Sequence, residues 1–162
     1  ALKTGRIDIG FGRIAQPDPA ITSHVLHEEP LALAMAPDSP LAQTSAPLPP
    51  DAVRHETLIV YPKEPRPSFA DEVLQVLQRH NVKPANVTEV RELQTALGLV
   101  AAGFGVCVVP ESAQQLRQDV HYRRLDSPRA VSPVIFNHRS HDHSPMLALV
   151  RKHLGLGPGD GA

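Results

Sequence analysis

The sequence contains no tryptophan, a single cysteine, and few aromatic residues, which make up 4% of its 162 positions. One cysteine excludes a disulfide framework and is compatible with a reducing compartment, so we expect a cytoplasmic protein. We find no secretory signal and no apolar run of about 18 residues, so we expect no membrane contact. The charges nearly cancel, with 16 Lys and Arg against 17 Asp and Glu. This balance argues against the basic surface that nucleic-acid binding needs.

What is present is an alternation of short apolar runs and helical patterns, which predicts an α/β fold with mostly parallel sheets. Two strands, 21–26 and 31–36, are expected to be separated by a crossing near Glu28-Glu29-Pro30. The further strands are expected at 7–11, 57–61, 87–90, 106–109, 120–125 and 131–138. Helices are expected at 68–80, 111–117 and 145–154, and in the stretch 93–101. The stretch 37–50 holds five prolines and is expected to be a surface connection.

The most informative segment runs from Glu89 to Pro110 and reads EVRELQTALGLVAAGFGVCVVP. Its apolar residues fall at helical spacing, and Gly103 allows the turn that ends a helix. The apolar run 106–109 then predicts a strand that is covered on both faces. Cys107 lies in the middle of that strand, where a small core residue is far more probable than a nucleophile.

This segment resembles the effector-binding domain of LysR-type transcriptional regulators, in the branch that senses cis,cis-muconate or chloromuconates during catechol and benzoate degradation. Three other segments carry the same resemblance in the same order: GRIDIGFGR at 5–13, LIVYP at 58–62 and RPSFADEV at 66–73. The first of these is common to the whole family, whereas the run after Glu89 and the Pro-Ser-Phe turn are more restricted. The resemblance covers the chain from Leu2 to about Leu156.

The resemblance implies two Rossmann-like lobes joined by two crossover segments, as in type 2 periplasmic-binding proteins. One lobe would comprise residues 1–28 and 134–162, the other residues 29–133. By the same comparison, the chain is expected to lack the first βαβ unit of the outer lobe and the winged helix-turn-helix. The glycine-rich end, 155–162, is expected to be disordered because it offers little to bury.

The sharpest candidate for ligand binding is Pro67-Ser68-Phe69, at the start of the expected helix 68–80. A helix N-terminus offers unpaired N–H groups and a partial positive charge, which suit a carboxylate. The family resemblance implies that this turn contacts the effector, with Ser68 adding a hydroxyl and Phe69 covering the apolar middle of the acid. The alternative is that Ser68 is an ordinary N-cap and Phe69 a core residue.

A second hypothesis pairs Arg13 with Glu92 across the cleft between the lobes. An incoming carboxylate would compete with Glu92 for Arg13 and couple ligand charge to lobe closure. The alternative is that both are solvated charges at the ends of their elements.

The segment HRSHDH, 138–143, contains three histidines and an aspartate, which are residue types that bind zinc. Three histidines in a polar loop are, however, more often simply exposed to solvent. His24 and His27 would point to opposite faces of a strand, which argues against a joint site. We expect no metal, and no cofactor, because no phosphate loop or dinucleotide fingerprint is present. No catalytic constellation appears either, so we do not expect an enzyme.

The sequence therefore predicts the effector-binding domain of a bacterial LysR-type regulator that responds to a small unsaturated dicarboxylate, for which cis,cis-muconate is the leading candidate. Its partners would be that effector, further copies in a homo-oligomer, and DNA through the absent helix-turn-helix domain. Two alternatives stay open at this point. One is a free-standing two-lobe solute-binding protein for a small organic acid, and the other is a small metal-dependent α/β enzyme.

Overall fold

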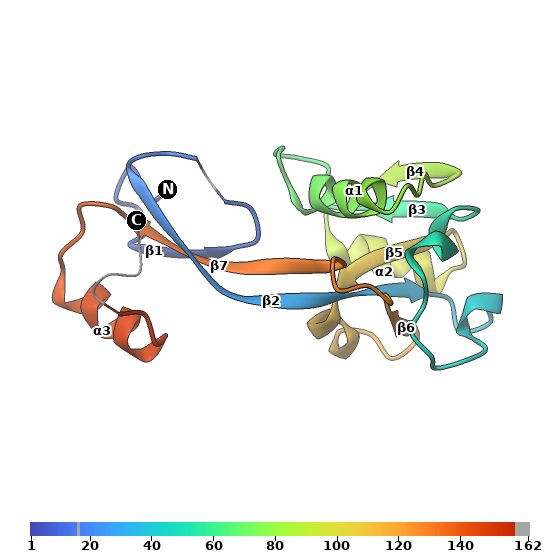
Figure 1. Ribbon diagram of the computed structural model, residues 1–162. Coiled ribbons are helices and arrows are strands. Elements are labelled where there is room, and N and C mark those ends of the chain that lie inside the picture. Colours follow the sequence, from blue (N-terminus) through green and yellow to red (C-terminus); the bar gives the residue numbers. More distant parts are fainter. Residues whose placement is uncertain (16, 158–162) are drawn as a thin grey trace. The chain divides into compact units, whose positions relative to one another are not determined.

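The computed structural model describes residues 1–15 and 17–157, and the chain forms two compact units. Unit 1 consists of Ala1–Glu28 and the chain from Pro133 onward, and unit 2 consists of Glu29–Ser132. Figure 1 labels the elements. The strands are β1 (Ile9–Gly12), β2 (Ile21–Met35), β3 (Thr57–Val60), β4 (Asn86–Glu89), β5 (Val106–Pro110), β6 (His121–Arg124) and β7 (Val131–Arg139). The α-helices are α1 (Phe69–Arg79), α2 (Leu93–Ala101) and α3 (Pro145–His153). Three 3-10 turns, η1 (Pro40–Ala42), η2 (Pro50–Val53) and η3 (Glu111–Gln115), lie in unit 2.

Unit 2 is a sheet with a packed apolar layer on each face. Its strands follow the order β6-β2-β5-β3-β4, in which β3 pairs in parallel with β4 and β5, whereas β2 pairs antiparallel with β5 and β6. Successive residues of a strand point to opposite faces. Leu31, Leu33 and Met35 accordingly join one buried cluster, which includes residues of α1. Ala32 and Ala34 join the other, which includes residues of α2. The two helices therefore cover opposite faces of the sheet.

The parallel pairs arise because helices make the connections. α1 links β3 to β4, and α2 links β4 to β5, so each crossover returns the chain in the same direction. Two glycines, Gly103 and Gly105, lie in the turn between α2 and β5. Gly105 has φ +156°, and a Cβ placed there would lie 2.3 Å from the Thr57 carbonyl oxygen. The turn into β5 therefore needs a residue without a side chain.

Unit 1 is smaller and less apolar inside. β1 pairs antiparallel with β7, in register from Ile9 opposite His138 to Gly12 opposite Ile135. The Phe11 and Phe136 rings meet at a centroid distance of 5.5 Å. α3 begins after Ser144, whose hydroxyl accepts a hydrogen bond from the Leu147 N–H at 3.2 Å.

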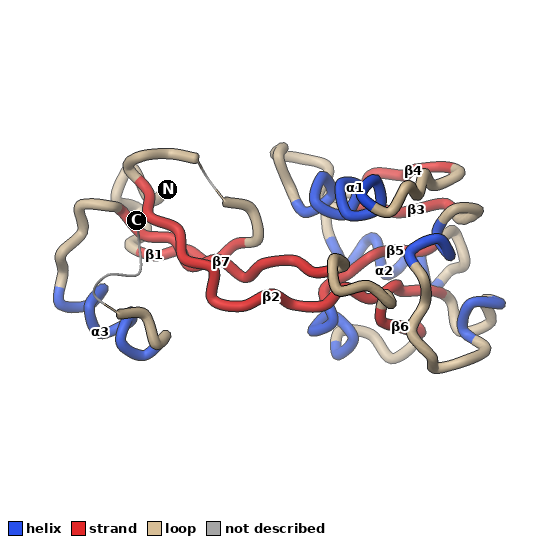
Figure 2. The backbone as a smooth tube through the Cα atoms, in the orientation of Figure 1, coloured by secondary structure: helices blue, strands red, loops and turns tan. Residues whose placement is uncertain are grey.

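The structure corrects three of the expectations about secondary structure. First, 21–26 and 31–36 belong to one continuous strand, β2, which Figure 2 shows as a long red segment. Pro30 is tolerated because the ladder between β2 and β5 begins one residue later, at Leu31, so the missing N–H costs that ladder nothing. Second, the sheets are mixed, not mostly parallel. Third, the helix expected at 111–117 is the shorter 3-10 turn η3.

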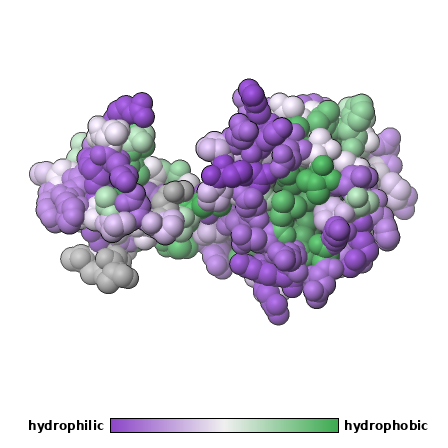
Figure 3. Space-filling model, turned by 90° about the horizontal axis from the view of Figure 1, so that it is seen from above, coloured by the Kyte–Doolittle hydropathy of each residue, from purple (hydrophilic) through white to green (hydrophobic). Residues whose placement is uncertain are grey.

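The tail expected to be disordered falls largely outside the described residues, which end at Gly157. No helix within the described ranges is long and apolar enough to cross a membrane. Large hydrophobic side chains nevertheless reach solvent on both units, and Figure 3 shows a group of them on one face of unit 2. The most exposed are Phe104 (68%) in unit 2 and Met146 (67%) in unit 1.

Candidate functional site

The start of α1 is built by a short-range polar network. Ser68 is the N-cap, with extended backbone angles of φ −141° and ψ 178°. The Asp71 carboxylate accepts a hydrogen bond from the Ser68 N–H at 2.7 Å. In return, the Ser68 carbonyl accepts one from the Asp71 N–H at 3.0 Å. This is the local reason the helix starts where it does, since the carboxylate replaces a partner that the helix cannot supply.

Arg66 ties this cap to its surroundings. Its guanidinium donates to Asp71 Oδ1 at 2.5 Å and also to the Glu89 carboxylate at the end of β4. A third hydrogen bond, from Arg66 Nε to the Lys63 carbonyl at 2.9 Å, closes the turn that precedes α1. One side chain thus joins the turn, the helix and the neighbouring strand.

The three predicted residues at this turn differ in exposure. Pro67 is exposed, whereas Ser68 and Phe69 are only 5% and 8% exposed. The Ser68 hydroxyl donates to the Pro62 carbonyl at 2.9 Å. The Phe69 ring packs against Tyr61 at a centroid distance of 5.4 Å. Both buried side chains therefore already have structural contacts.

The main chain at this helix end has unused donors. The N–H groups of Phe69 and Ala70, the first two helical residues, donate to no acceptor among the residues that the structure describes. The N–H groups of Asp71 and Glu72, by contrast, both donate to the Ser68 carbonyl. N–H groups at the positive end of a helix suit a carboxylate, but Ala70 is 0% exposed and Phe69 only 8%, so a ligand must displace the residues that cover this turn to reach them.

Arg13 and Glu92 belong to different units. Arg13 follows β1 in unit 1, and Glu92 is the exposed N-cap of α2 in unit 2. Their ion pair stays a prediction.

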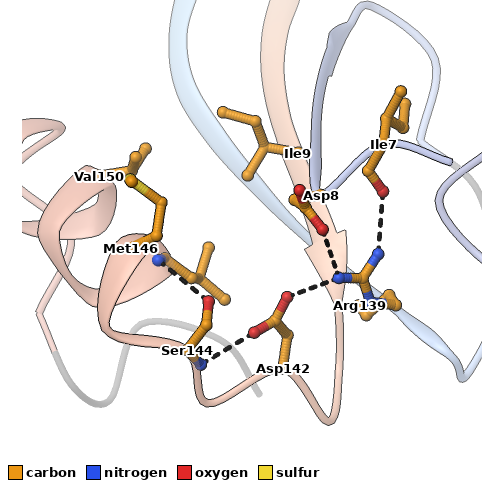
Figure 4. A pocket seen from close by; sticks show the side chains of 9 residues that line it. Ile7, Asp8, Ile9, Arg139, Asp142, Ser144, Met146 and Val150 are labelled. Atoms are coloured by element: carbon orange, nitrogen blue, oxygen red, sulfur yellow. Dashed lines mark hydrogen bonds and ion pairs between the residues drawn. The ribbon is translucent and has the colours of Figure 1, made fainter. Parts of the chain in front are cut away.

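A second polar centre, which the sequence did not point to, lies in unit 1 beside a hollow of about 580 Å³ (Figure 4). Arg139 donates to Asp8 at 2.8 Å, to Asp142 at 2.9 Å, and to the carbonyls of Leu2 and Ile7. The carboxylates raise the pKa of Arg139, Asp8 above all. The pKa of Asp142 is lowered, mainly by the hydrogen bond from the Ser144 N–H and further by Arg139.

The apolar side chains around this hollow come from β1, from the segment that precedes it, and from α3. They are Ile7, Ile9, Met146, Leu147 and Val150. Figure 4 shows three hydrogen bonds of Arg139, to the Asp8 and Asp142 carboxylates and to the Ile7 carbonyl. The arrangement therefore fastens the segment before β1 to the loop before α3. One guanidinium faces two carboxylates, so the surplus charge beside the hollow is negative and does not favour an anionic ligand.

The histidines do not form a metal site. His138 is buried, not exposed in a loop as expected, and its Nε2 lies 3.1 Å from Nε2 of the buried His24. Because the Arg139 carbonyl can only accept, His138 Nδ1 carries a proton, and its Nε2 accepts from His24 when both rings are neutral. His141 and His143 are exposed. No group of three or more metal-ligating side chains occurs within the described parts of the chain.

Sequence reasoning missed both the histidine pair and the Arg66 network for the same reason. His24 and His138 are 114 residues apart, and Arg66 and Glu89 are 23 apart. Only Asp71, at the third position of the helix, carried a local signal, because Ser followed three residues later by an acid is typical of a helix start.

Cys107 is buried as expected, and burial raises the pKa of its thiol, which keeps it protonated and unreactive.

Comparison with known proteins places these features in a family context. The family model described as the LysR substrate binding domain matches residues 1–155. A probable cat1 operon transcriptional activator from Acinetobacter lwoffii is 59% identical over 152 residues, covering 94% of this chain and 50% of the relative. The regulator CatR from Pseudomonas putida is 48% identical over 148 residues, covering 91% of this chain and 50% of the relative.

A solved structure shows the same likeness. The BenM effector-binding domain with its effector benzoate matches with a TM-score of 0.84 at 34% identity, covering 96% of this chain and 74% of that one. The chain spans about half the length of the curated relatives it matches, and those relatives are transcriptional regulators, not enzymes.

Proposed function

The chain belongs to the LysR substrate-binding domain family, and from this premise we propose that it is the effector-binding part of a transcriptional regulator of aromatic-acid breakdown. The effector we propose is a small unsaturated dicarboxylate, cis,cis-muconate. DNA binding and assembly into an oligomer would involve the portion of the regulator that this chain does not span. Two relatives support the assignment as a transcriptional regulator, since one is named a probable cat1 operon transcriptional activator and the other is the regulator CatR.

The observation that carries the ligand proposal is the pair of free N–H groups at Phe69 and Ala70 in α1. The benzoate named for the related BenM domain is also a carboxylate. Since the side chains of Ser68 and Phe69 are buried and already engaged, we assign the carboxylate contact to the main chain and the apolar contact to the Tyr61–Phe69 face. This assignment modifies the original hypothesis, in which the Ser68 hydroxyl was a donor to the ligand.

The test is binding of four probes to the full-length protein: cis,cis-muconate, a chloromuconate, benzoate and adipate. A probe at about 100 times its Kd stabilises the folded state by roughly 2.7 kcal/mol, a readable thermal shift. We expect stabilisation by muconate and none by adipate, whose saturated chain must be ordered on binding. If none of the four stabilises the protein, the ligand class is wrong.

A matched pair of variants locates the site. Ser68→Asp places a negative charge at the helix end and cannot donate to the Pro62 carbonyl, so muconate affinity should fall about tenfold or more. Ser68→Asn has nearly the shape of Ser68→Asp, is neutral and can still donate through its amide, so it should keep most of the wild-type affinity. Equal affinities in the two variants would place the carboxylate elsewhere.

A further inference from the structure

We infer that Arg66 is the positioning residue of this site: it balances the charge of Asp71 and holds the turn before α1, so that the helix end accepts a carboxylate. This inference rests on the proposed function. Arg66 itself is not assigned a contact with the ligand, because its hydrogen bonds go to Asp71, Glu89 and a carbonyl of the turn.

Three acidic side chains surround this helix end. Asp71 and Glu72 lie in the first turn of α1, and Glu89 ends the neighbouring strand β4. A helix N-terminus contributes roughly half a positive charge, which a single uncompensated carboxylate outweighs. Arg66 offsets one of these three negative charges, and without it the repulsion of a dicarboxylate would be greater by one full charge. Arg66 is the cation in direct contact with Asp71 and Glu89.

Arg66 also fixes the geometry of the turn before α1. The Arg66 side chain donates back to the Lys63 carbonyl, which fixes residues 63–66 as a closed loop before the helix. It also holds one oxygen of Asp71 while the other accepts the Ser68 N–H. The carboxylate that caps the helix is therefore fixed from both sides. A planar guanidinium suits this task, since it donates in several fixed directions and stays charged.

The decisive experiment measures cis,cis-muconate affinity by calorimetry on the full-length protein. Arg66→Gln should weaken binding on the order of 10- to 50-fold, because Asp71 is left unbalanced beside the site. Arg54→Gln is the matched control. Arg54 pairs with Asp51 and donates to the Asn81 carbonyl beyond the opposite end of α1, so its loss should leave the affinity unchanged. Equal losses in both variants would overturn the inference.

Two further readouts separate charge balance from simple damage to the fold. Adding Asp71→Asn to Arg66→Gln removes the unbalanced charge, while the amide oxygen can still accept the Ser68 N–H, so most of the lost affinity should return. High salt should also narrow the gap between Arg66→Gln and wild type, because an exposed charge is screened. If neither the second substitution nor salt recovers affinity, Arg66 does not act through charge.

A measurement without ligand keeps this inference distinct from the proposed function. In Arg66→Gln, the Ser68 amide should lose protection against hydrogen exchange on the order of tenfold, because its carboxylate acceptor is no longer fixed. Arg54→Gln should not change it. If the Ser68 amide keeps its protection in Arg66→Gln, the positioning role is wrong, whichever of the four probes the wild-type protein binds. A wild-type protein that binds none of the four probes overturns the ligand class, and hydrogen exchange then decides whether Arg66 positions this helix end.

Discussion

The two units achieve their folds by different means. Unit 2 buries two apolar clusters, one on each face of its sheet, with fully buried members such as Leu33 and Leu97. In unit 1 the buried hydrophobic residues among those described are few: Ile135, Phe136 and Leu147. Polar residues are buried beside them, among them His24, Asn137 and His138.

Unit 1 compensates with specific polar pairs. Ser23 donates to Asn137 at 2.6 Å, His24 meets His138, and Arg139 joins four acceptors. Hydrogen bonds contribute about 1 kcal/mol each and depend on geometry, whereas burial of a large apolar side chain contributes about 1.5–3 kcal/mol. We conclude that unit 2 carries most of the folding free energy. Unit 1 should be the part that responds first to changes in charge.

The largest effect is expected from the core of unit 2. Leu97→Ala, at a position that is 0% exposed on α2, should lower the free energy of unfolding by about 2–5 kcal/mol. Leu149→Ala on α3 is the control, since Leu149 is 52% exposed and surface changes usually stay within about 0.5 kcal/mol. Denaturant unfolding measures both. Similar losses would mean that burial on α2 does not account for the stability of unit 2.

The sequence anticipated those parts of unit 2 that local chemistry determines. The cap residue Ser68 and the acids after it predicted α1 to within one residue at each end, and Gly103 predicted the end of α2. β2 was predicted as two strands because Pro30 interrupts its pattern, and only the register with β5 explains why the strand continues. The continuity of β2 is thus determined by its pairing with β5, which is distant in the sequence.

The sequence predicted where α1 begins but not the contacts around its first turn. The turn 67–69 does start a helix with free N–H groups, as the pattern of Pro, Ser and an apolar residue indicated. That the Ser68 hydroxyl is already used by Pro62, and that Arg66 reaches β4, depend on how the turn folds back onto β3 and β4. No spacing rule in a single sequence carries that information.

A smaller effect on the free energy of unfolding is expected at the closely packed turn into β5. Gly105→Ala should cost about 2–4 kcal/mol, because the new Cβ would collide with the Thr57 carbonyl in a backbone conformation that suits glycine alone. Gly103→Ala is the same substitution at another glycine with a positive φ, +77°. A Cβ at Gly103 would have no neighbour within 4 Å, so this variant should cost only about 1 kcal/mol. Thermal unfolding of the two variants checks the difference. Equal costs would show that the turn into β5 relaxes freely.

The smallest effect concerns unit 1 and pH. The pKa of Asp142 is lowered from its ordinary value of 3.8 by the Ser144 N–H and Arg139, and that of Asp18 is lowered by Lys3. A carboxylate whose pKa is lower in the folded state stabilises the fold above its unfolded pKa of about 4, and this contribution is lost below that value, as pH falls through the lowered folded pKa. Unit 1 should therefore loosen between about pH 4 and pH 2, before the apolar core of unit 2.

NMR signals of residues in unit 1, followed from pH 6 to pH 2, test this order of events. Asp142→Asn should lower the stability of unit 1 at neutral pH and flatten its acid response, because the charged acceptor is gone at every pH. Asp119→Asn is the control in unit 2, where the pKa of Asp119 is likewise lowered by its hydrogen bond with Arg117. That pair lies at the surface and is two residues apart, so its loss should leave the unit 1 profile unchanged. Simultaneous acid unfolding of both units in the wild type would mean that the polar pairs of unit 1 are no more sensitive to charge than the apolar core of unit 2.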